Sequence, residues 1–315
     1  MITIGIDFGG TLTKIASIEK GKIIHRRVLD SYSDKSFAST ILNVQHEINE
    51  ILETNNLTGE LKGIGISIPG IVDSKNLKLL SINDKFIDAK TFDFRDWGKR
   101  NWNVPISLEN DARSTLIGEW QYGKGKGYNN IVMITLGTGI GTAALVDGKV
   151  LRGKHFIAGI LGGHFIINED GFKCNCGNIG CSEAQASTWN LNTLIRSFNF
   201  QGKSILFSQD KIDYKTIFTE ADKEDALAIM VRDYSLNIWT KTIVNLIYAY
   251  DPEIIILAGG IMKSAKHILP FIKSHIYDYG WASFENYQIS CTENIDDSAL
   301  LSAEYLISNL QKNQL

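Results

Sequence analysis

Four metal-binding side chains lie close together near the middle of the sequence. His164 precedes Cys174, Cys176 and Cys181 in a run that reads Gly-His-x9-Cys-x-Cys-Gly-x-x-Gly-Cys-x-Glu. Three thiolates and one imidazole are the ligands of a closed tetrahedral zinc site. The alternatives are a disulfide with a spare thiol, or three unrelated cysteines. The zinc interpretation is favoured because Cys291 lies far away and nothing else indicates an oxidising compartment. Since protein would supply all four ligands, we expect a structural zinc.

A strand, a glycine-rich loop and a returning hairpin occur twice in the chain. The first loop is Gly9-Gly10-Thr11, with a hairpin turn at Lys20-Gly21, and the second is Gly137-Thr138-Gly139, with a turn at Asp147-Gly148. The predicted strands are 2–7, 14–18 and 22–29 in the first copy and 131–136, 141–146 and 149–150 in the second. The pattern predicts an internal duplication of topology.

Each loop has the features of a phosphate cradle, because glycines let backbone N–H groups come close to an anion. Neither loop is a Walker A sequence, and neither leads into a helix as a Rossmann fingerprint does. The first loop also follows Asp7, a candidate magnesium anchor, although a turn or cap carboxylate is the alternative for this residue.

Composition and charge indicate an ordinary soluble protein. The chain has 315 residues, 44% of them hydrophobic and 21% charged, with a net charge of -3. This length predicts two domains, and the charge excludes a nucleic-acid-binding face because such a face needs clustered basic residues. No signal segment and no membrane span is predicted, so we expect a cytoplasmic protein without a membrane partner.

The remaining pattern alternates helices and strands. Helices are predicted at 36–54, 110–121, 184–198, 224–250 and 298–309, and further strands at 61–68, 106–108 and 252–257. The predicted domains are a small α/β lobe at 1–115, completed by the C-terminal helix 298–315, and a larger lobe at 116–297 that carries the zinc loop. Asn110-Asp111 falls where a strand gives way to a helix, and taken alone it favours a helix cap.

Together these motifs resemble the ROK family of sugar kinases and related repressors. The resemblance rests on Asp7-x-Gly-Gly-Thr, Pro69-Gly70, Asn110-Asp111-Ala112, Leu-Gly-Thr-Gly-Ile-Gly at 136–141, the zinc signature at 163–183 and Ala258-Gly259-Gly260. It implies a duplicated actin-like (ribonuclease H-like) α/β fold whose two lobes enclose a cleft for a nucleotide and a sugar. It also implies ATP with Mg²⁺ as cofactor, a small sugar as substrate, and a homodimer.

The resemblance also assigns roles to individual residues. It places Asp7, Gly9, Gly10, Thr11, Gly137, Thr138 and Gly139 around the ATP phosphates and their magnesium, and Gly259 and Gly260 at the adenosine. Asp111 would be the base that accepts the proton of the sugar hydroxyl. The expected sugar-binding residues are Asn83, Asn110, Asp111, His164 and Glu183, so the zinc loop would shape the sugar-binding wall. The role of Lys14 is left open, because its spacing differs from that of the family's usual lysine.

One segment departs from the family pattern. The family usually has Ala-Gly-Glu-x-Gly-His, whereas this chain has Ile160-Leu161-Gly162-Gly163 before His164 and lacks the glutamate. Losing one hydrogen-bond partner of a buried hydroxyl costs about 1–3 kcal/mol, which points away from a plain glucose kinase. The leading hypothesis is an ATP-dependent kinase for a hexose or hexose derivative. The alternative is a catalytically weak sugar sensor, and a repressor is disfavoured because no helix-turn-helix domain precedes the first loop.

Overall fold

The computed structural model describes residues 1–31, 36–82, 86–209, 211–280, 287–293 and 297–312, which form two compact units. Unit 1 comprises Met1–Gly127, Arg152–Ala158 and Asp296–Leu315, and unit 2 comprises Tyr128–Leu151 and Gly159–Ile295. The boundary expected near residue 115 therefore lies elsewhere, because residue 115 is inside a helix that unit 1 retains. The sequence also gave no sign that the short segment Arg152–Ala158 belongs to unit 1.

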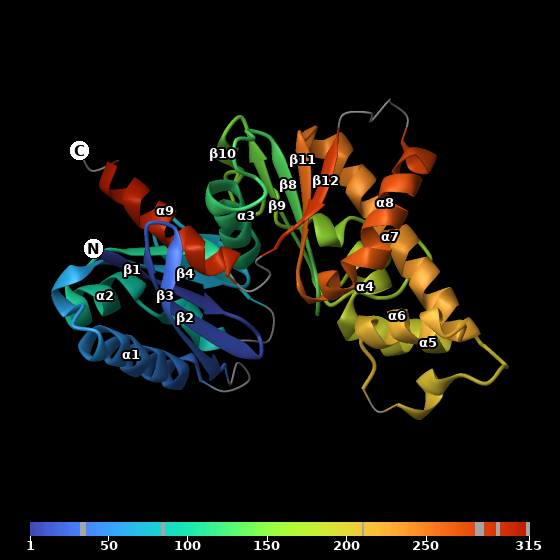
Figure 1. Ribbon diagram of the computed structural model, residues 1–315, viewed down its shortest axis with the longest axis horizontal. Helices are drawn as coiled ribbons and strands as arrows, with labels where there is room; N and C mark the ends of the chain where they lie inside the picture. Colours follow the sequence, from blue (N-terminus) through green and yellow to red (C-terminus); the bar gives the residue numbers. More distant parts are fainter. Residues whose placement is uncertain (32–35, 83–85, 210, 281–286, 294–296, 313–315) are drawn as a thin grey trace. The chain divides into compact units, whose positions relative to one another are not determined.

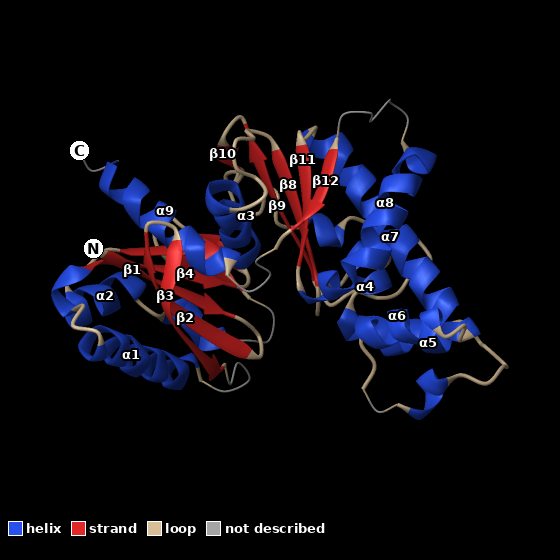
Figure 2. Cartoon of the chain, in the orientation of Figure 1, coloured by secondary structure: helices blue, strands red, loops and turns tan. Residues whose placement is uncertain are grey.

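Unit 1 is built on a mixed five-stranded sheet (Figures 1 and 2). In spatial order its strands are β3 (Lys22–Asp30), β2 (Leu12–Glu19), β1 (Ile2–Phe8), β4 (Leu61–Ile68) and β7 (Ile106–Asn110). Strands β1, β4 and β7 are parallel, and β1 pairs with β2 in antiparallel fashion. A separate hairpin consists of β5 (Ile71–Asp73) and β6 (Lys78–Ser81).

Helices cover both faces of this sheet. They are α1 (Phe37–Thr54), α2 (Phe94–Trp102), α3 (Asp111–Tyr122) and α9 (Ser298–Lys312), with 3-10 turns η1 (Thr58–Glu60) and η2 (Ile87–Thr91). Ser36 caps α1 by accepting the Ala38 N–H, and the helix buries one face through Ile41, Val44 and Ile48. The last helix, α9, packs against α3, β1 and β4, as the sequence predicts.

Unit 2 repeats the plan of unit 1. Its sheet has the order β10 (Lys149–Val150), β9 (Ile140–Val146), β8 (Ile131–Leu136), β11 (Ile254–Ala258) and β12 (Gln288–Cys291). The pairing directions of β10, β9, β8, β11 and β12 match those of β3, β2, β1, β4 and β7. Both hairpin turns also use two successive left-handed residues, Lys20-Gly21 and Asp147-Gly148. The predicted internal duplication is confirmed.

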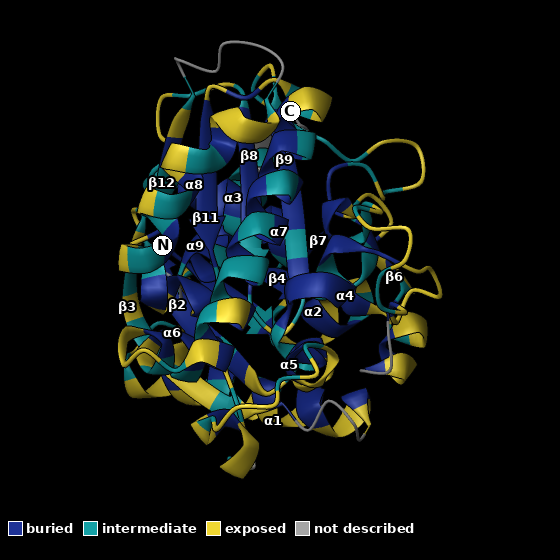
Figure 3. Ribbon diagram, turned by 90° about the vertical axis from the view of Figure 1, so that its right-hand side faces the viewer, coloured by how far each residue is buried: buried dark blue, intermediate teal, exposed yellow. Residues whose placement is uncertain are grey.

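The helices of unit 2 include two long ones that pack together, α7 (Ala226–Tyr250) and α8 (Ala265–Tyr279). The others are α4 (Ser182–Ala186), α5 (Leu191–Ser197) and α6 (Tyr214–Asp222), with 3-10 turns η3 (Gly162–His164), η4 (Thr188–Asn190), η5 (Ile205–Ser208) and η6 (Gly260–Ser264). Strands β8 and β11 are buried, as their dark blue colour in Figure 3 shows. No helix in the described part of the chain combines the length and the apolar character needed to cross a membrane.

The continuous helix predicted over 184–198 is wrong. The chain is extended at Ser187 and forms the separate elements α4, η4 and α5. The break has a physical cause, because the N–H groups of Thr188 and Trp189 donate to the carbonyls of Gly137 and Thr138 (3.1 Å each). These hydrogen bonds replace helical ones and attach the segment to the second glycine loop.

Candidate functional site

A row of polar residues crosses the sheet of unit 1 near the end of β1. Asp7 lies opposite Lys14 on β2 and opposite Ser67 on β4, and Ser67 lies opposite Glu109 on β7. Directly paired residues share one face of a sheet, so the four side chains belong to one face. The Ser67 hydroxyl donates to Asp7 Oδ1 (2.7 Å). Asp7 is half-buried, so its carboxylate combines a fixed orientation with access for a ligand.

The first glycine loop is closed by its own hairpin. Gly9 N–H donates to the Leu12 carbonyl (3.0 Å), and Ser31 N–H donates to the Thr11 carbonyl (2.9 Å). The Ser31 hydroxyl donates to the Gly9 carbonyl (2.7 Å) and lies 2.8 Å from the Thr13 hydroxyl. The loop formed by Gly9, Gly10 and Thr11 is therefore fixed at both ends by residues of unit 1.

Asn110 is the cap of α3, and Asp111 is the first residue of that helix. The side-chain oxygen of Asn110 accepts the Arg113 N–H (3.1 Å). Its amide group donates to Asp111 Oδ1 (2.8 Å) and to the Gly70 carbonyl (2.9 Å). Asp111 Oδ1 also accepts the Ala112 N–H (2.9 Å). The capping role considered for this pair thus belongs to Asn110, while Asp111 is held in one orientation.

The electrostatic surroundings of Asp111 suit a proton acceptor. Burial raises the pKa of Asp111 to about 6, opposed by the hydrogen bond from Ala112, while the negative charge of Asp7 acts in the same direction as burial. A carboxylate with a pKa near 6 is ionised at neutral pH and is a stronger base than an ordinary aspartate. The three predicted site residues Asp7, Asn110 and Asp111 all belong to unit 1. The predicted sugar residue Asn83 lies outside the described residues.

The second glycine loop is held from outside its hairpin. Gly137 N–H donates to the Gly139 carbonyl (3.0 Å), which closes the loop. The Glu183 carboxylate accepts the Ile140 N–H (2.8 Å), and the Thr188 and Trp189 N–H groups bind loop carbonyls as described above. One oxygen of Glu183, predicted to face a sugar, is therefore committed to the end of this loop.

Gly259 and Gly260 follow β11 and begin η6 beside the second loop. Gly259 has a φ of 92° and lies so close to Leu136, at the end of β8, that no Cβ would fit. The pair therefore lies at the same end of the parallel strands β8 and β11 as the Gly137–Gly139 loop. Unit 2 thus brings the second glycine loop, predicted to bind phosphates, close to the two glycines predicted to bind adenosine.

The four predicted metal ligands form one compact group. Their ligand atoms all lie within 4.8 Å of one another. Cys174 Sγ is 3.6 Å from His164 Nδ1, and Cys176 Sγ is 3.6 Å from Cys181 Sγ. A zinc–sulfur bond of about 2.3 Å implies tetrahedral S···S edges of about 3.8 Å, so the group fits zinc. All four cysteines are free thiols, which excludes the disulfide alternative in this structure.

Backbone hydrogen bonds organise the cysteine segment. Gly177 N–H donates to the Cys174 carbonyl (3.0 Å), and Cys174 N–H donates to the Asn178 carbonyl (2.8 Å). Gly177 and Gly180 adopt positive φ angles of 96° and 82°, as expected for turn formers. Burial raises the pKa of Cys181 to about 12. A cation bound here would therefore have to displace protons from the thiols.

The turn that carries His164 packs on β9, directly after the second loop. The Gly162 N–H donates to the Thr142 hydroxyl (2.9 Å), which donates to the Gly159 carbonyl (2.6 Å). A Cβ at Gly163 would overlap the Ile140 carbonyl oxygen. Gly162 and Gly163, the two glycines before His164, therefore permit a close approach to β9.

Several supporting residues were missed by sequence reasoning. They are Ser31, Ser67, Glu109, Thr142, Thr188 and Trp189. Ser67 and Glu109 had a usable signal, because polar residues in otherwise apolar strands are unusual. The contacts of Ser31, Thr188 and Trp189 depend on tertiary packing and leave no local pattern.

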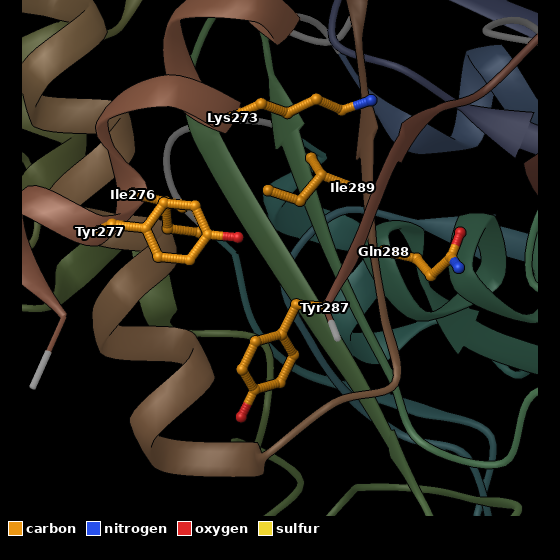
Figure 4. A pocket seen from close by; sticks show the side chains of 6 residues that line it. All are labelled: Lys273, Ile276, Tyr277, Tyr287, Gln288 and Ile289. Carbon is orange, nitrogen blue, oxygen red and sulfur yellow. The ribbon is translucent and has the colours of Figure 1, made fainter. Parts of the chain in front are cut away.

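A cavity of about 340 Å³ lies elsewhere in unit 2, between α8 and β12 (Figure 4). Lys273 and Tyr277 of α8 line it together with Tyr287 and Ile289 near β12. None of the described residues that the sequence predicts for the site lines this cavity. Gln288 sits at the start of β12, opposite the start of β11, whereas Gly259 follows the end of β11.

Comparisons with known proteins agree with these features. Residues 3–309 match the family model described as the ROK family. The chain is 30% identical to a glucokinase from Thermotoga maritima, over 96% of each protein. It is 29% identical to a xylose repressor from Bacillus spizizenii, over 87% of this chain and 67% of the repressor.

A solved structure extends the likeness to the fold. The ROK family glucokinase from Streptomyces griseus, determined in complex with glucose and AMPPNP, superposes with a TM-score of 0.79 at 23% identity, over 98% of this chain and 100% of that chain. The matched sheets of the two units and this likeness show the duplicated actin-like fold that the sequence predicts.

Proposed function

This chain belongs to the ROK family, and we propose that it is an ATP-dependent sugar kinase that transfers the γ-phosphate to a hydroxyl of a hexose or hexose derivative. The observation that carries the proposal is Asp111, a carboxylate held by Asn110 and Ala112 with its pKa raised to about 6. Relatives named glucokinase, each 30% identical to this chain, support a sugar kinase.

In this proposal Asp111 takes the proton of the attacking sugar hydroxyl. Phosphoryl transfer depends mostly on positioning and on neutralising charge, with one carboxylate accepting the proton. Asp111 Oδ1 is occupied by two donors, so Oδ2 is the natural proton acceptor. Asn110 would position a neighbouring sugar hydroxyl, and Asn83 remains a predicted sugar residue.

The nucleotide would be bound by the two glycine loops. Gly9, Gly10 and Thr11 and the second loop, Gly137–Gly139, offer backbone N–H groups to the phosphates, and Gly259 and Gly260 would contact adenosine. Asp7, oriented by Ser67, is the residue proposed to hold the magnesium that accompanies ATP. Magnesium would supply neutralisation of the phosphate charge.

The cysteine group is proposed to bind a structural zinc that fixes the sugar-binding wall. His164 would serve as a ligand and, with Glu183, would border the sugar. Because Leu161 and the glycines after it provide no carboxylate before His164, we propose a substrate that differs from glucose at the hydroxyl the family glutamate binds. A homodimer is also proposed, on the family resemblance alone.

A coupled assay of ATP turnover against hexoses, amino sugars and N-acetylated sugars tests the proposal. We expect one sugar class to give saturable ADP formation that requires magnesium, with the product identified by mass spectrometry. Sugar binding in calorimetry without turnover on any member of the panel would instead support the alternative, a sugar sensor. A specific observation favours that alternative, because the xylose repressor described above aligns with 87% of this chain.

A further inference from the structure

The segment Arg152–Ala158 lies between two parts of unit 2, yet it belongs to unit 1. The chain thus leaves unit 2 after Leu151 and returns to it at Gly159. The segment is itself a closed loop, because the Ala158 N–H donates to the Arg152 carbonyl (3.2 Å). What holds this loop in unit 1 is a group of three charged side chains beside Asp111.

Glu109 is the centre of this charged group. Its side chain is fully buried, and its Oε1 accepts the N–H of Asn110 (3.0 Å), the residue that orients Asp111. Its Oε2 accepts two hydrogen bonds from Arg152, from Nε (2.9 Å) and from Nη2 (2.6 Å). One carboxylate thereby links the start of the loop to the backbone at Asn110.

Arg113 holds the other end of the loop. It is two residues after Asp111 on α3, its side chain is fully buried, and its Nη1 lies 3.6 Å from Glu109 Oε1. Its Nη2 donates to the carbonyls of Phe156 (3.0 Å) and Ala158 (2.9 Å). Phe156 has a φ of 60°, a left-handed conformation that costs a non-glycine residue energy. The two Arg113 hydrogen bonds stabilise this unusual backbone.

The next residue is fixed in unit 2. The Gly159 carbonyl accepts the Thr142 hydroxyl (2.6 Å), and the same hydroxyl accepts the N–H of Gly162 in the turn that carries His164. Two adjacent carbonyls are therefore anchored on different units, Ala158 by Arg113 and Gly159 by Thr142. After Ala158 the chain continues through three residues, Gly159 to Leu161, into the turn Gly162–His164.

We propose that Arg113 and Arg152, through Glu109, are positioning residues that fix the Arg152–Ala158 loop in unit 1, and that phosphorylation of the sugar depends on this fixed loop, from which the chain continues to the His164 turn. The inference rests on the proposed function, in which Asp111 is the base and His164 borders the sugar. Neither arginine needs to touch the substrate. They act by fixing the point at which the chain leaves unit 1. A displacement of a reacting group by about 1 Å can cost on the order of 10²-fold in rate.

The test compares Arg152→Met with Lys154→Met on the full-length protein. Lys154 lies in the same loop, is exposed, and loses the same charge in its variant. We expect Arg152→Met to raise the sugar KM and lower kcat, with a combined loss of about 10- to 100-fold, while the ATP KM changes little. Lys154→Met should behave like the wild type. Arg152→Lys should recover only part of the loss, because one ammonium replaces a two-nitrogen contact.

A second readout does not depend on activity. Amide hydrogen exchange in peptides covering 152–159 should be faster in Arg152→Met than in Lys154→Met, with the zinc content and melting temperature reported for each. If Arg152→Met is recovered unfolded, Arg113→Lys serves as a second variant, because it keeps the buried charge. It should also raise the sugar KM while the ATP KM changes little.

The outcomes separate this inference from the proposed function. If the wild type is active and Arg152→Met has unchanged sugar kinetics, the inference is wrong and the proposed function stands, whatever the hydrogen-exchange rates. A loss that affects the sugar and ATP KM equally would also overturn it, since it would reflect general destabilisation. A wild type that phosphorylates no sugar would refute the proposed function, and the inference with it.

Discussion

The two glycine loops have the same topology but are held in different ways. The first loop, Gly9–Thr11, is fixed by its own hairpin and by Ser31, all within the first part of unit 1. The second loop, Gly137–Gly139, is fixed by Glu183, Thr188 and Trp189, which follow Cys181 in the chain. The two copies therefore share their strand topology and differ in the contacts that support the loop.

This difference suggests that the two units contribute different things to the site. Unit 1 carries the carboxylates Asp7 and Asp111 beside a loop that needs no distant partner. Unit 2 carries a loop whose shape depends on the segment organised by the cysteine group. Trp189 joins the two features directly, because its backbone binds the loop while its ring packs against the cluster of Cys174, Cys181 and Ala184. Changes at the cysteine group should therefore reach the second loop and spare the first.

The largest expected effect comes from Asp111→Asn, which alters the chemistry of unit 1 and leaves both loops in place. Asparagine keeps an oxygen to accept the Asn110 and Ala112 hydrogen bonds but cannot accept a proton. We expect kcat to fall by about 10²- to 10⁴-fold with sugar and nucleotide binding retained. Steady-state kinetics and calorimetry on the best sugar test this. A variant with near wild-type kcat would remove Asp111 from the catalytic role.

The second prediction concerns metal removal. Chelation or Cys181→Ser should release about one zinc per chain and raise the ATP KM as well as the sugar KM. The loss of the Glu183 hydrogen bond to Ile140, worth about 1.5–3 kcal/mol for a charged acceptor, corresponds to about 10- to 100-fold. Tryptophan fluorescence should report the change through Trp189.

Cys291→Ser is the matched control, because Cys291 lies outside the metal-binding group. It should keep both zinc and activity. If the zinc-free protein keeps its full ATP affinity, the second loop is independent of the metal segment, and the contrast between the loops is lost.

The sequence anticipated those parts of the site that have a local signature. The cysteine spacing and the two strand–loop–strand copies were readable because ligand types and glycines recur at fixed intervals. The supports of the second loop had no such signature: the segment 184–198 was expected to be one helix, and tertiary hydrogen bonds to Gly137 and Thr138 interrupt it. Likewise, nothing local indicated that Arg152–Ala158 would join unit 1, since its anchors Glu109 and Arg113 are distant in sequence.

The third prediction is a pH dependence set by unit 1. With the pKa of Asp111 raised to about 6, kcat should be flat above pH 7 and fall about tenfold per pH unit below 6. The stability of the fold should depend on pH in the opposite direction to kcat. Because burial raises the pKa of Asp111 from 3.8, the protonated carboxyl favours the folded state. This stabilisation is fully present below about pH 4 and is lost as the pH rises through 6.

Asp111→Asn should therefore be more stable than the wild type at pH 7, by about 1–3 kcal/mol, and equally stable at pH 4. Denaturant unfolding at the two pH values measures this difference. A wild-type kcat that is constant from pH 5 to 8 would assign the proton to another group.

The smallest expected effect tests the self-contained nature of the first loop. Ser31→Ala removes the part-buried hydrogen bond to the Gly9 carbonyl and the buried contact with the Thr13 hydroxyl. The free energy of unfolding should fall by about 1–3 kcal/mol, since the buried hydroxyl of Thr13 loses its partner. The ATP KM should rise only a few-fold, because Gly9 and Thr11 keep their backbone hydrogen bonds. Zinc content should not change, as unit 1 alone supports this loop.

Ser39→Ala, at an exposed serine of α1, is the control for losing a hydroxyl. If Ser31→Ala lost zinc, or altered Trp189 fluorescence as chelation does, the two loops would share one support and the division of labour proposed between the units would be wrong.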